Sequence, residues 1–154
     1  MHRLAGLCAR SEQCSDDIMR KALRAGMTRE AASEILDHLK EKGFVDDARY
    51  ASALVRDAAA LRGWGTIRIR RELALRHIPA QVIADALDEI DREAYDARMS
   101  RLALNKAASL DLRLREDNLR LYRYLASRGY TSAECVDQVK RCRRIQREED
   151  EEEA

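Results

Sequence analysis

Three positions in this 154-residue chain, Gly26, His77 and Gly129, mark a unit that recurs every 51 to 52 residues. These positions are termed the anchors. Apolar residues fall at the same distances from each anchor, namely eight before, four before, one after and ten after it. They are Ile18, Ile69 and Leu121; Ala22, Leu73 and Leu125; Met27, Ile78 and Tyr130; and Leu36, Leu87 and Val139. A period of this size is typical of repeat architectures, in which neighbouring units complete one another's hydrophobic core.

Two residues after each anchor stands a residue that begins helices well: Thr28, Pro79 or Thr131. Threonine accepts hydrogen bonds at helix N-caps, and proline fits the first helical turn because it lacks an N–H group. Each anchor is therefore expected to form a tight turn between two helices. With one further helix per copy, the sequence predicts an all-α fold of tandem three-helix repeats, with helix-turn-helix-like units.

The repeat boundaries are set by this register. We expect repeat 1 over residues 1–43, repeat 2 over 44–91, repeat 3 over 92–147 and an acidic tail over 148–154. Repeat 1 should open with a short segment, His2–Arg10, and continue with a helix capped by Ser15. Thr66 should cap a helix in repeat 2. The middle helix of repeat 3 begins near either Asp111 or Asn118, and the sequence leaves both open.

The net charge of +1 hides a strong asymmetry along the chain. Residues 148–154 hold six acidic groups, so residues 1–147 carry 29 basic and 22 acidic side chains, a net of +7. A dense acidic run buries little apolar surface, and we expect the tail to be disordered. No apolar run approaches the roughly 20 residues that span a bilayer, and no signal segment opens the chain. We therefore expect a cytoplasmic protein with no membrane partner.

The four cysteines, Cys8, Cys14, Cys135 and Cys142, lack the spacing of zinc ligands or of a disulfide framework. In the repeat register, Cys135 matches Ala32 and Ile83, and Cys142 matches Leu39 and Ile90, so both are expected in the core. The sequence has no Ser/His/Asp set and no Walker-type phosphate loop. We expect no catalytic residues, no metal and no cofactor, and hence a protein that is not an enzyme.

One short motif admits two interpretations. Gly63, Gly65 and Thr66 precede a helix that carries Arg68, Arg70 and Arg71, so free backbone N–H groups and guanidinium groups could bind an anion there. An ordinary glycine turn followed by a threonine cap explains the glycines and the threonine equally simply, and we favour it.

Arginine also recurs in the repeat register. Six residues before the anchors stand Arg20, Arg71 and Arg123. On a helix this position lies away from the apolar positions, so the three side chains should reach solvent. If the repeats stack in series, these arginines form a basic row. Chance matches among the many arginines, or pairing of each with a neighbouring acid, would explain the pattern as well.

The chain resembles the RecX family, bacterial regulators of the RecA recombinase, over nearly its whole length, to about residue 145. The resemblance rests on the run from Phe44 to Ala51, on Arg62-Gly63-Trp64-Gly65 and on the run from Ile67 to Leu73, with support from Leu125 to Tyr130. It implies tandem three-helix repeats that form an elongated, curved molecule lying in the groove of the RecA–DNA filament. It further implies inhibition of strand exchange, ATPase and coprotease activities, and weak DNA binding in some members.

Two functional hypotheses result. The first is a monomeric, non-catalytic regulator that binds the RecA–DNA filament, with weak and salt-sensitive binding to DNA itself. The second is a stand-alone DNA-binding protein of helix-turn-helix type, whose arginine-bearing helix would enter a groove. A helical scaffold for an unrelated acidic partner is a third possibility. The residues expected to contact the filament or DNA are Arg20, Arg62, Trp64, Arg68, Arg70, Arg71, Arg76 and Arg123.

Overall fold

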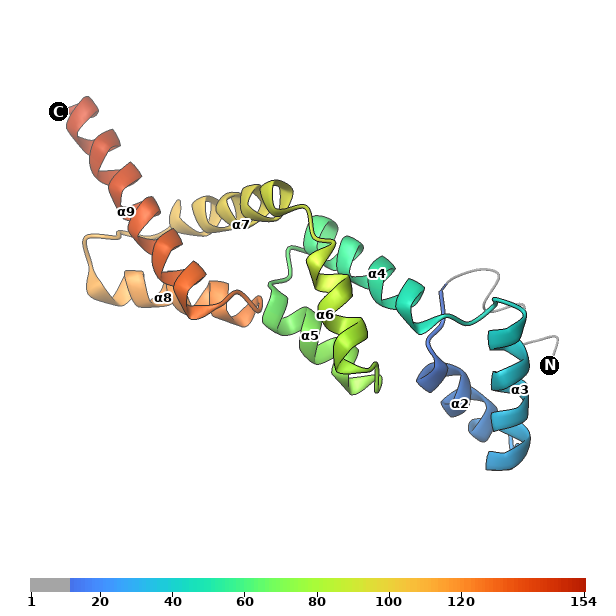
Figure 1. The fold of residues 1–154 in the computed structure, drawn as a ribbon. Coiled ribbons are helices and arrows are strands. Elements are labelled where there is room, and N and C mark those ends of the chain that lie inside the picture. Colours follow the sequence, from blue (N-terminus) through green and yellow to red (C-terminus); the bar gives the residue numbers. More distant parts are fainter. Residues whose placement is uncertain (1–11) are drawn as a thin grey trace. The chain divides into compact units, whose positions relative to one another are not determined.

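The computed structural model describes residues 12–154, so the predicted opening segment His2–Arg10 and Cys8 lie outside the described residues. Every regular element within 12–154 is a helix, which confirms the predicted all-α class. The elements, drawn in Figure 1, are α2 (Ser15–Arg24), α3 (Arg29–Glu41), α4 (Asp47–Asp57), the π-helix η1 (Ala58–Arg62), α5 (Thr66–Leu75), α6 (Ala80–Asp88), α7 (Arg92–Ala107), α8 (Arg115–Ser127) and α9 (Ser132–Glu153).

The chain divides into two compact units. The first takes in the described residues up to Val55 together with residues 71–89, and the second takes in residues 56–70 and 90–154. Two of the dividing points fall within the last turn of α4 and within α5, and the third lies between Glu89 and Ile90. The boundaries of the three repeats stay a prediction.

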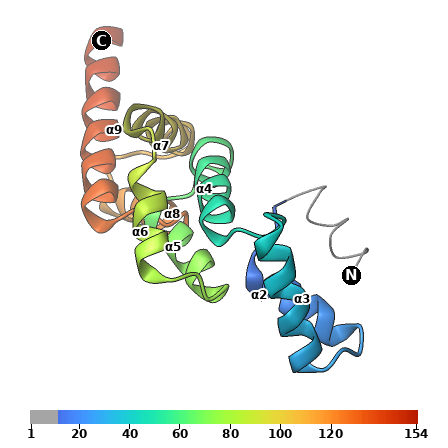
Figure 2. The same cartoon turned by 45° about the vertical axis from the view of Figure 1, so that its right-hand side comes forward.

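In the first unit, α2 and α3 lie side by side in both views (Figures 1 and 2). Cys14, not Ser15, is the N-cap of α2, and its Sγ accepts a hydrogen bond from the Asp17 N–H at 3.4 Å. The prediction of a Ser15 cap is wrong because Ser15 instead donates its N–H and its hydroxyl to Asp47, each at 2.8 Å. One hydrophobic core cluster of this unit consists of Ile18, Ala22, Ala32, Leu36, Leu39 and Val45.

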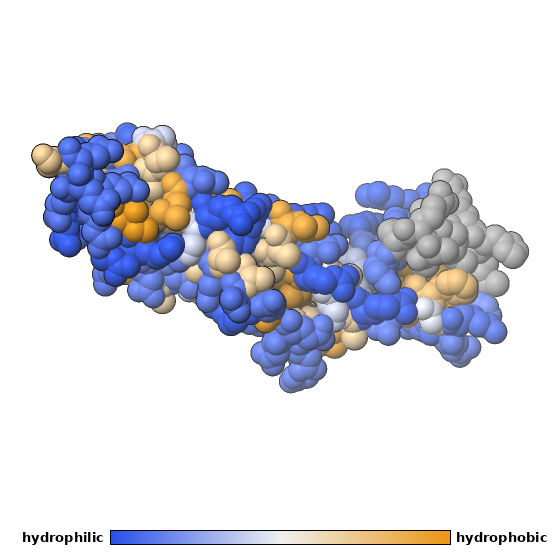
Figure 3. Space-filling model, turned by 90° about the horizontal axis from the view of Figure 1, so that it is seen from above, coloured by the Kyte–Doolittle hydropathy of each residue, from blue (hydrophilic) through white to orange (hydrophobic). Residues whose placement is uncertain are grey.

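In the second unit, α7, α8 and α9 pack around a narrow core. Tyr95 of α7 and Tyr130 meet edge to face, with ring centroids 5.6 Å apart. Cys135 and Cys142 are buried on α9, as the repeat register predicts. Hydrophilic residues cover most of the surface drawn in Figure 3, with only separate apolar areas between them. This agrees with a chain that is 37% charged and 5% aromatic.

All three anchors adopt the left-handed backbone conformation that ends a helix. The φ angles are +88° at Gly26, +56° at His77 and +94° at Gly129. This conformation costs little for glycine and more for a residue with a Cβ atom. The repeat register therefore locates the turns correctly, including the one at which histidine stands in place of glycine.

The helix caps after the anchors agree in part with the sequence. Thr28 caps α3, and Thr131 forms a capping box with Glu134 at the start of α9. Pro79 stands at the N-cap of α6 rather than inside its first turn. Thr66 is the first residue of α5 and does not cap it, because the Ile69 N–H bonds the carbonyl of Gly65, one residue earlier.

In the third repeat, the structure shows where the middle helix begins and how far the last helix extends. Helix α8 begins at Arg115, midway between the two alternatives. Helix α9 continues through the acidic residues to Glu153, so the expectation of a disordered tail is wrong. The pairs Arg144–Glu148 and Arg147–Glu151 join neighbouring turns at spacing i, i+4 and support the helix beyond its packed part.

Candidate binding surface around Trp64

Trp64 is the only tryptophan of the chain. Two guanidinium groups lie near its ring, one from Arg62, which precedes it in the sequence, and one from Arg68, which follows it. The Arg68 Cζ atom lies 4.0 Å from the centroid of the Trp64 ring, and the Arg62 Cζ atom lies 5.2 Å from it. Both distances are within cation–π range. Trp64 and Arg68 are half-buried, whereas Arg62 is exposed. We term Arg62, Trp64 and Arg68 the Trp64 cluster.

The turn that ends η1 determines the position of the Trp64 backbone. Gly63 follows η1 with a left-handed φ of +62°, and the Gly63 and Trp64 N–H groups both bond the Ala58 carbonyl. The carbonyl of Gly63 accepts hydrogen bonds from the Tyr130 hydroxyl at 2.9 Å and from Arg128 Nε at 3.3 Å. These contacts fix the backbone on the amino-terminal side of the tryptophan.

Arg98 and Arg128 donate hydrogen bonds to the carbonyl groups at the end of η1. In the sequence they look like ordinary surface arginines. Arg128 donates to the carbonyl of Arg62 as well as to that of Gly63, and Arg98 donates to the carbonyl of Leu61 at 3.3 Å. Cations at a helix C-terminus satisfy its free carbonyls and complement its dipole. Arg98 and Arg128 are therefore structural, and no local sequence signal identifies them because each contact spans at least 37 residues.

On the carboxyl-terminal side of Trp64, a close backbone contact explains why residue 65 is a glycine. The Gly65 N–H donates to the Arg128 carbonyl at 2.9 Å, and the Ile67 N–H donates to the Gly129 carbonyl at 3.0 Å. A Cβ atom on Gly65 would collide with the backbone of Gly129. Gly65 is thus required for the approach of the α8–α9 turn and not for an unusual backbone angle.

These contacts argue against the anion-binding interpretation of this motif. The Trp64, Gly65 and Ile67 N–H groups bond carbonyls, and the Thr66 N–H donates to the Tyr95 hydroxyl at 3.2 Å. With these four donors committed to internal partners, the amino end of α5 does not present the free N–H groups that hold a phosphate. A ligand at this surface is therefore expected to be bound by side chains.

The other predicted site residues lie on three helices, except Arg76, which follows the end of α5. Arg70 and Arg71 are exposed on α5, Arg20 is exposed on α2 and Arg123 is exposed on α8. Arg20 pairs with Asp17, as the alternative explanation for the basic row expects. Arg76 is half-buried and bonds both the carboxylate and the carbonyl of Glu72, at 3.2 and 3.1 Å. The row of Arg20, Arg71 and Arg123 stays a prediction, since Arg123 belongs to the second unit and the other two to the first.

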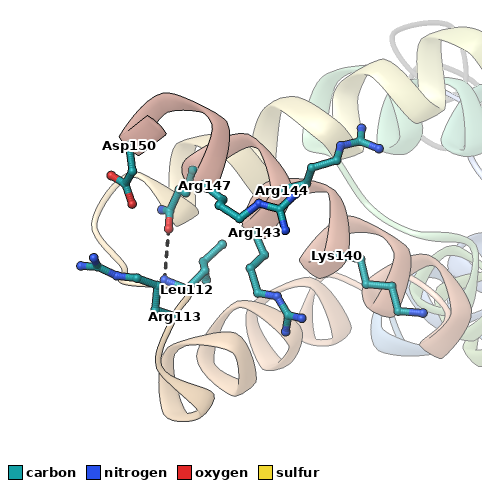
Figure 4. A pocket seen from close by; sticks show the side chains of 8 residues that line it. Leu112, Arg113, Lys140, Arg143, Arg144, Arg147 and Asp150 are labelled. Atoms are coloured by element: carbon teal, nitrogen blue, oxygen red, sulfur yellow. Dashed lines mark hydrogen bonds between the residues drawn. The ribbon is translucent and has the colours of Figure 1, made fainter. Parts of the chain in front are cut away.

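Sequence reasoning missed a second basic surface. Lys140, Arg143, Arg144 and Arg147 of α9 line a groove with Arg113 of the α7–α8 loop (Figure 4). The signal was available, because residues 140–147 hold five cations in eight positions. The acidic tail beyond them reduced the apparent charge of this region.

Tyr95 and Tyr130 of the second unit are buried. Burial, together with the carboxylate of Glu134, raises the pKa of Tyr95 to about 12. Burial also raises the pKa of Tyr130 far above its ordinary value.

Among residues 12–154 no cluster of histidine, cysteine and acidic side chains has the arrangement of a metal site. No helix in that part of the chain is both long and apolar enough to cross a membrane.

Comparison with known proteins points to one family. Residues 46–87 match the family model described as RecX, second three-helix domain. The chain is 36% identical over 87 residues to the regulatory protein RecX of Xanthomonas axonopodis pv. citri (strain 306), which covers 56% of this chain and 53% of that protein. It is 33% identical over 132 residues to the regulatory protein RecX of Stenotrophomonas maltophilia (strain K279a), covering 84% and 78%.

The fold is similar to two solved structures of this kind. The crystal structure of RecX from Lactobacillus salivarius aligns with a TM-score of 0.78 at 16% identity, over 92% of each chain. Another crystal structure of regulatory protein RecX aligns with a TM-score of 0.77 at 22% identity, over 90% of this chain and 68% of that one. These likenesses show the shared fold. The match to the Xanthomonas relative spans about half of that protein's length.

Proposed function

Because the chain belongs to the RecX family of regulatory proteins, we propose that it is a non-catalytic regulator that binds the RecA–DNA filament. In this proposal it acts as a monomer in the cytoplasm and lowers the strand-exchange, ATPase and coprotease activities of the recombinase. Its contact with the filament is made by side chains, with the Trp64 cluster at the centre and Arg70 beside it on α5.

The main support for this proposal is that the guanidinium groups of Arg62 and Arg68 both lie within cation–π distance of the Trp64 ring. Stacking on an aromatic ring uses the face of a guanidinium and leaves its N–H edges available. Those edges suit carboxylates and phosphates, which are the groups that a protein–DNA filament presents. An arginine already held in place also loses less rotational freedom when it binds. The segment that matches the second three-helix domain, residues 46–87, contains the whole cluster.

A triple variant tests this assignment. Arg62→Ala, Arg68→Ala and Arg70→Ala remove three cations from this surface, while the Cβ contact of Arg68 with Gly129 is kept. We expect inhibition of strand exchange and co-sedimentation with RecA filaments to weaken by about tenfold or more, since charged hydrogen bonds contribute about 1.5–3 kcal/mol each. The far-ultraviolet circular dichroism should keep its helical signal.

A matched control removes the same charge elsewhere. Arg24, Arg29 and Arg101 are exposed and belong to no part of the Trp64 cluster, so their triple alanine variant should inhibit within about twofold of the parent protein. If both triple variants inhibit equally well, the assignment of the Trp64 cluster fails. If neither the parent nor any variant binds filaments, the proposed function itself fails.

The stand-alone DNA-binding alternative is tested in parallel. Gel shifts on selected and random duplexes without recombinase distinguish the two hypotheses, because sequence-selective binding by the protein alone would favour the alternative. The commitment of the backbone N–H groups at the start of α5 to internal carbonyls and to Tyr95 weighs against that helix as a phosphate-anchored reader of DNA.

A further inference from the structure

A groove of about 570 Å³ lies between the α7–α8 loop and the carboxyl-terminal half of α9, entirely within the second unit. Five cations line it, namely Arg113, Lys140, Arg143, Arg144 and Arg147, together with the carboxylate of Asp150. The Arg113 guanidinium also donates to both carboxylate oxygens of Asp111, at 2.9 and 3.0 Å. We term it the α9 groove. None of its lining residues takes part in the Trp64 cluster.

The loop wall of the groove is held rigidly. The Leu112 N–H donates to Gln146 Oε1 at 3.1 Å, and Gln146 Nε2 donates to the carbonyls of Ala107 and Leu110, each at 3.0 Å. Leu112 is fully buried, and its carbonyl accepts from Asn118 Nδ2 at 2.8 Å. One glutamine of α9 therefore fixes the loop that carries Arg113, so the wall needs no reordering when a ligand binds.

The cations are spread along the groove. Figure 4 shows Arg113 and Asp150 at one end and Lys140 at the other. Lys140 and Arg147 are seven residues apart on a continuous helix, which corresponds to about 10 Å. Phosphates of one nucleic-acid strand follow one another at about 3.4 Å along the axis of a duplex. The groove thus suits a row of phosphates better than a single ion.

The residues that line the α9 groove also indicate that it does not bind nucleic-acid bases. Leu112 and Gln146 complete the wall, and among the described residues no aromatic side chain lines the groove. Binding of single strands through their bases relies on stacking against aromatic rings. Contacts in this groove should therefore be made to the backbone and be independent of base sequence.

The acidic end of α9 lies within reach of the same cations. Glu148 Oε1 is 3.8 Å from Arg144 Nε, Glu151 Oε1 is 3.6 Å from Arg147 Nε, and Asp150 belongs to the groove lining. The paired side chains are largely exposed, and exposed pairs of this kind contribute little to stability. A ligand with several phosphates can replace them, at the cost of the pairs it breaks.

We propose that the α9 groove binds consecutive backbone phosphates of a nucleic-acid strand without reading its bases, and that the acidic end of α9 competes for the same arginines. Weak DNA binding is already expected from the family resemblance. The proposal goes beyond that expectation because it places the binding in the α9 groove, apart from the Trp64 cluster, and adds the competition with the acidic end of α9.

The test measures fluorescence anisotropy of labelled oligothymidylate with the full chain at low salt and without recombinase. The groove variant carries Arg143→Ala, Arg144→Ala and Arg147→Ala. It should bind about tenfold more weakly, and its slope of log affinity against log salt should be shallower by about two, because each phosphate contact on a single strand contributes about 0.7. The Arg24, Arg29 and Arg101 triple variant is the charge-matched control. Equal weakening in both overturns the site.

A second variant tests the competition. Glu148→Gln, Asp150→Asn and Glu151→Gln should tighten binding by about threefold or more, whereas Glu30→Gln, Glu34→Gln and Asp37→Asn on α3 remove the same charge and should tighten it less. Equal tightening overturns the role of the acidic end.

Two further arms identify the ligand. Oligothymidylate and oligodeoxyadenylate should bind within about twofold of each other, and a preference of tenfold or more would overturn backbone recognition. Inorganic tripolyphosphate should displace the oligonucleotide only at a much higher phosphate concentration. Displacement at equal phosphate concentration would assign the groove to free polyphosphates instead of a strand. Circular dichroism confirms that each variant keeps its fold.

Discussion

Gly65 and Gly129 lie in backbone contact across 64 residues of sequence. The carbonyl of Gly129 accepts the Ile67 N–H at 3.0 Å, and the residue before it, Arg128, accepts the Gly65 N–H at 2.9 Å. A Cβ atom on Gly129 would in turn collide with Arg68. The last anchor therefore does more than end α8, because it also docks against the start of α5 and supports the Trp64 cluster.

We expect Gly65→Ala to lower the free energy of unfolding by about 3 kcal/mol, since the added methyl group meets backbone on Gly129 that has little room to shift. Urea unfolding followed by circular dichroism measures this. Gly43→Ala is the control, because Gly43 has a φ of +75° but nothing within 4 Å of an added Cβ atom. It should cost only about 1 kcal/mol. A larger loss for Gly43→Ala would contradict the close approach.

His77 offers a test of the repeat register. His77→Gly and His77→Ala both remove the contact between His77 Nδ1 and Asp16 Oδ1, which measures 2.8 Å. Only glycine relieves the left-handed strain at φ +56°. We therefore expect the glycine variant to be more stable than the alanine variant by about 1 kcal/mol in thermal or urea unfolding. Equal stabilities would show that the backbone at this anchor is unstrained.

Arg68→Ala should expose Trp64 to solvent. The guanidinium of Arg68 lies 4.0 Å from the ring centroid, and the chain has no other tryptophan, so fluorescence reports on this one residue. Acrylamide quenching should increase and the emission should shift to longer wavelength. Arg70→Ala, on the same helix but outside the cluster, should change neither by a comparable amount. Unchanged quenching in Arg68→Ala would mean that Trp64 is not covered in solution.

Stability should fall at alkaline pH. Burial raises the pKa of Tyr95 to about 12, whereas an unfolded tyrosine ionises near 10. Between these values the folded state binds more protons, so the free energy of unfolding decreases as the pH rises, by up to about 1.4 kcal/mol per pH unit for one such group. Urea unfolding between about pH 9 and 11.5, which takes in the unfolded pKa and most of the interval up to the folded one, measures the slope. Tyr95→Phe should make it shallower, and an identical slope would contradict the prediction.

The sequence predicts those parts of the fold that depend on local chemistry. The turns at the anchors and the caps at Thr28 and Thr131 depend on residues near one another in the chain. The burial of Cys135 and Cys142 follows from the repeat register. The cap at Ser15 fails because Asp47, 32 residues away, takes both of its donors. The prediction of a disordered tail fails because composition alone ignores Arg144 and Arg147, which stand one turn before Glu148 and Glu151.

The candidate site shows the same limit. Arg62, Trp64 and Arg68 are close in sequence, and their convergence could be predicted from the turn between them. The reason for the two glycines could not, because it lies in Arg128, Gly129 and Tyr130 at the turn between α8 and α9. Contacts between residues so far apart in the sequence leave no period and no local motif.

The π-helix η1 makes the length of the alanine stretch before Trp64 more important than its composition. A π turn accommodates one residue more than an α turn. Deleting any one of Ala58, Ala59 and Ala60 would allow an ordinary α turn and would leave the segment beyond it near its present orientation, whereas inserting one further residue would rotate that segment by about 100° around the helix axis. Substitution by another small residue would leave that geometry in place. In alignments of this region, a one-residue insertion is therefore a larger change than a one-residue gap or a conservative exchange.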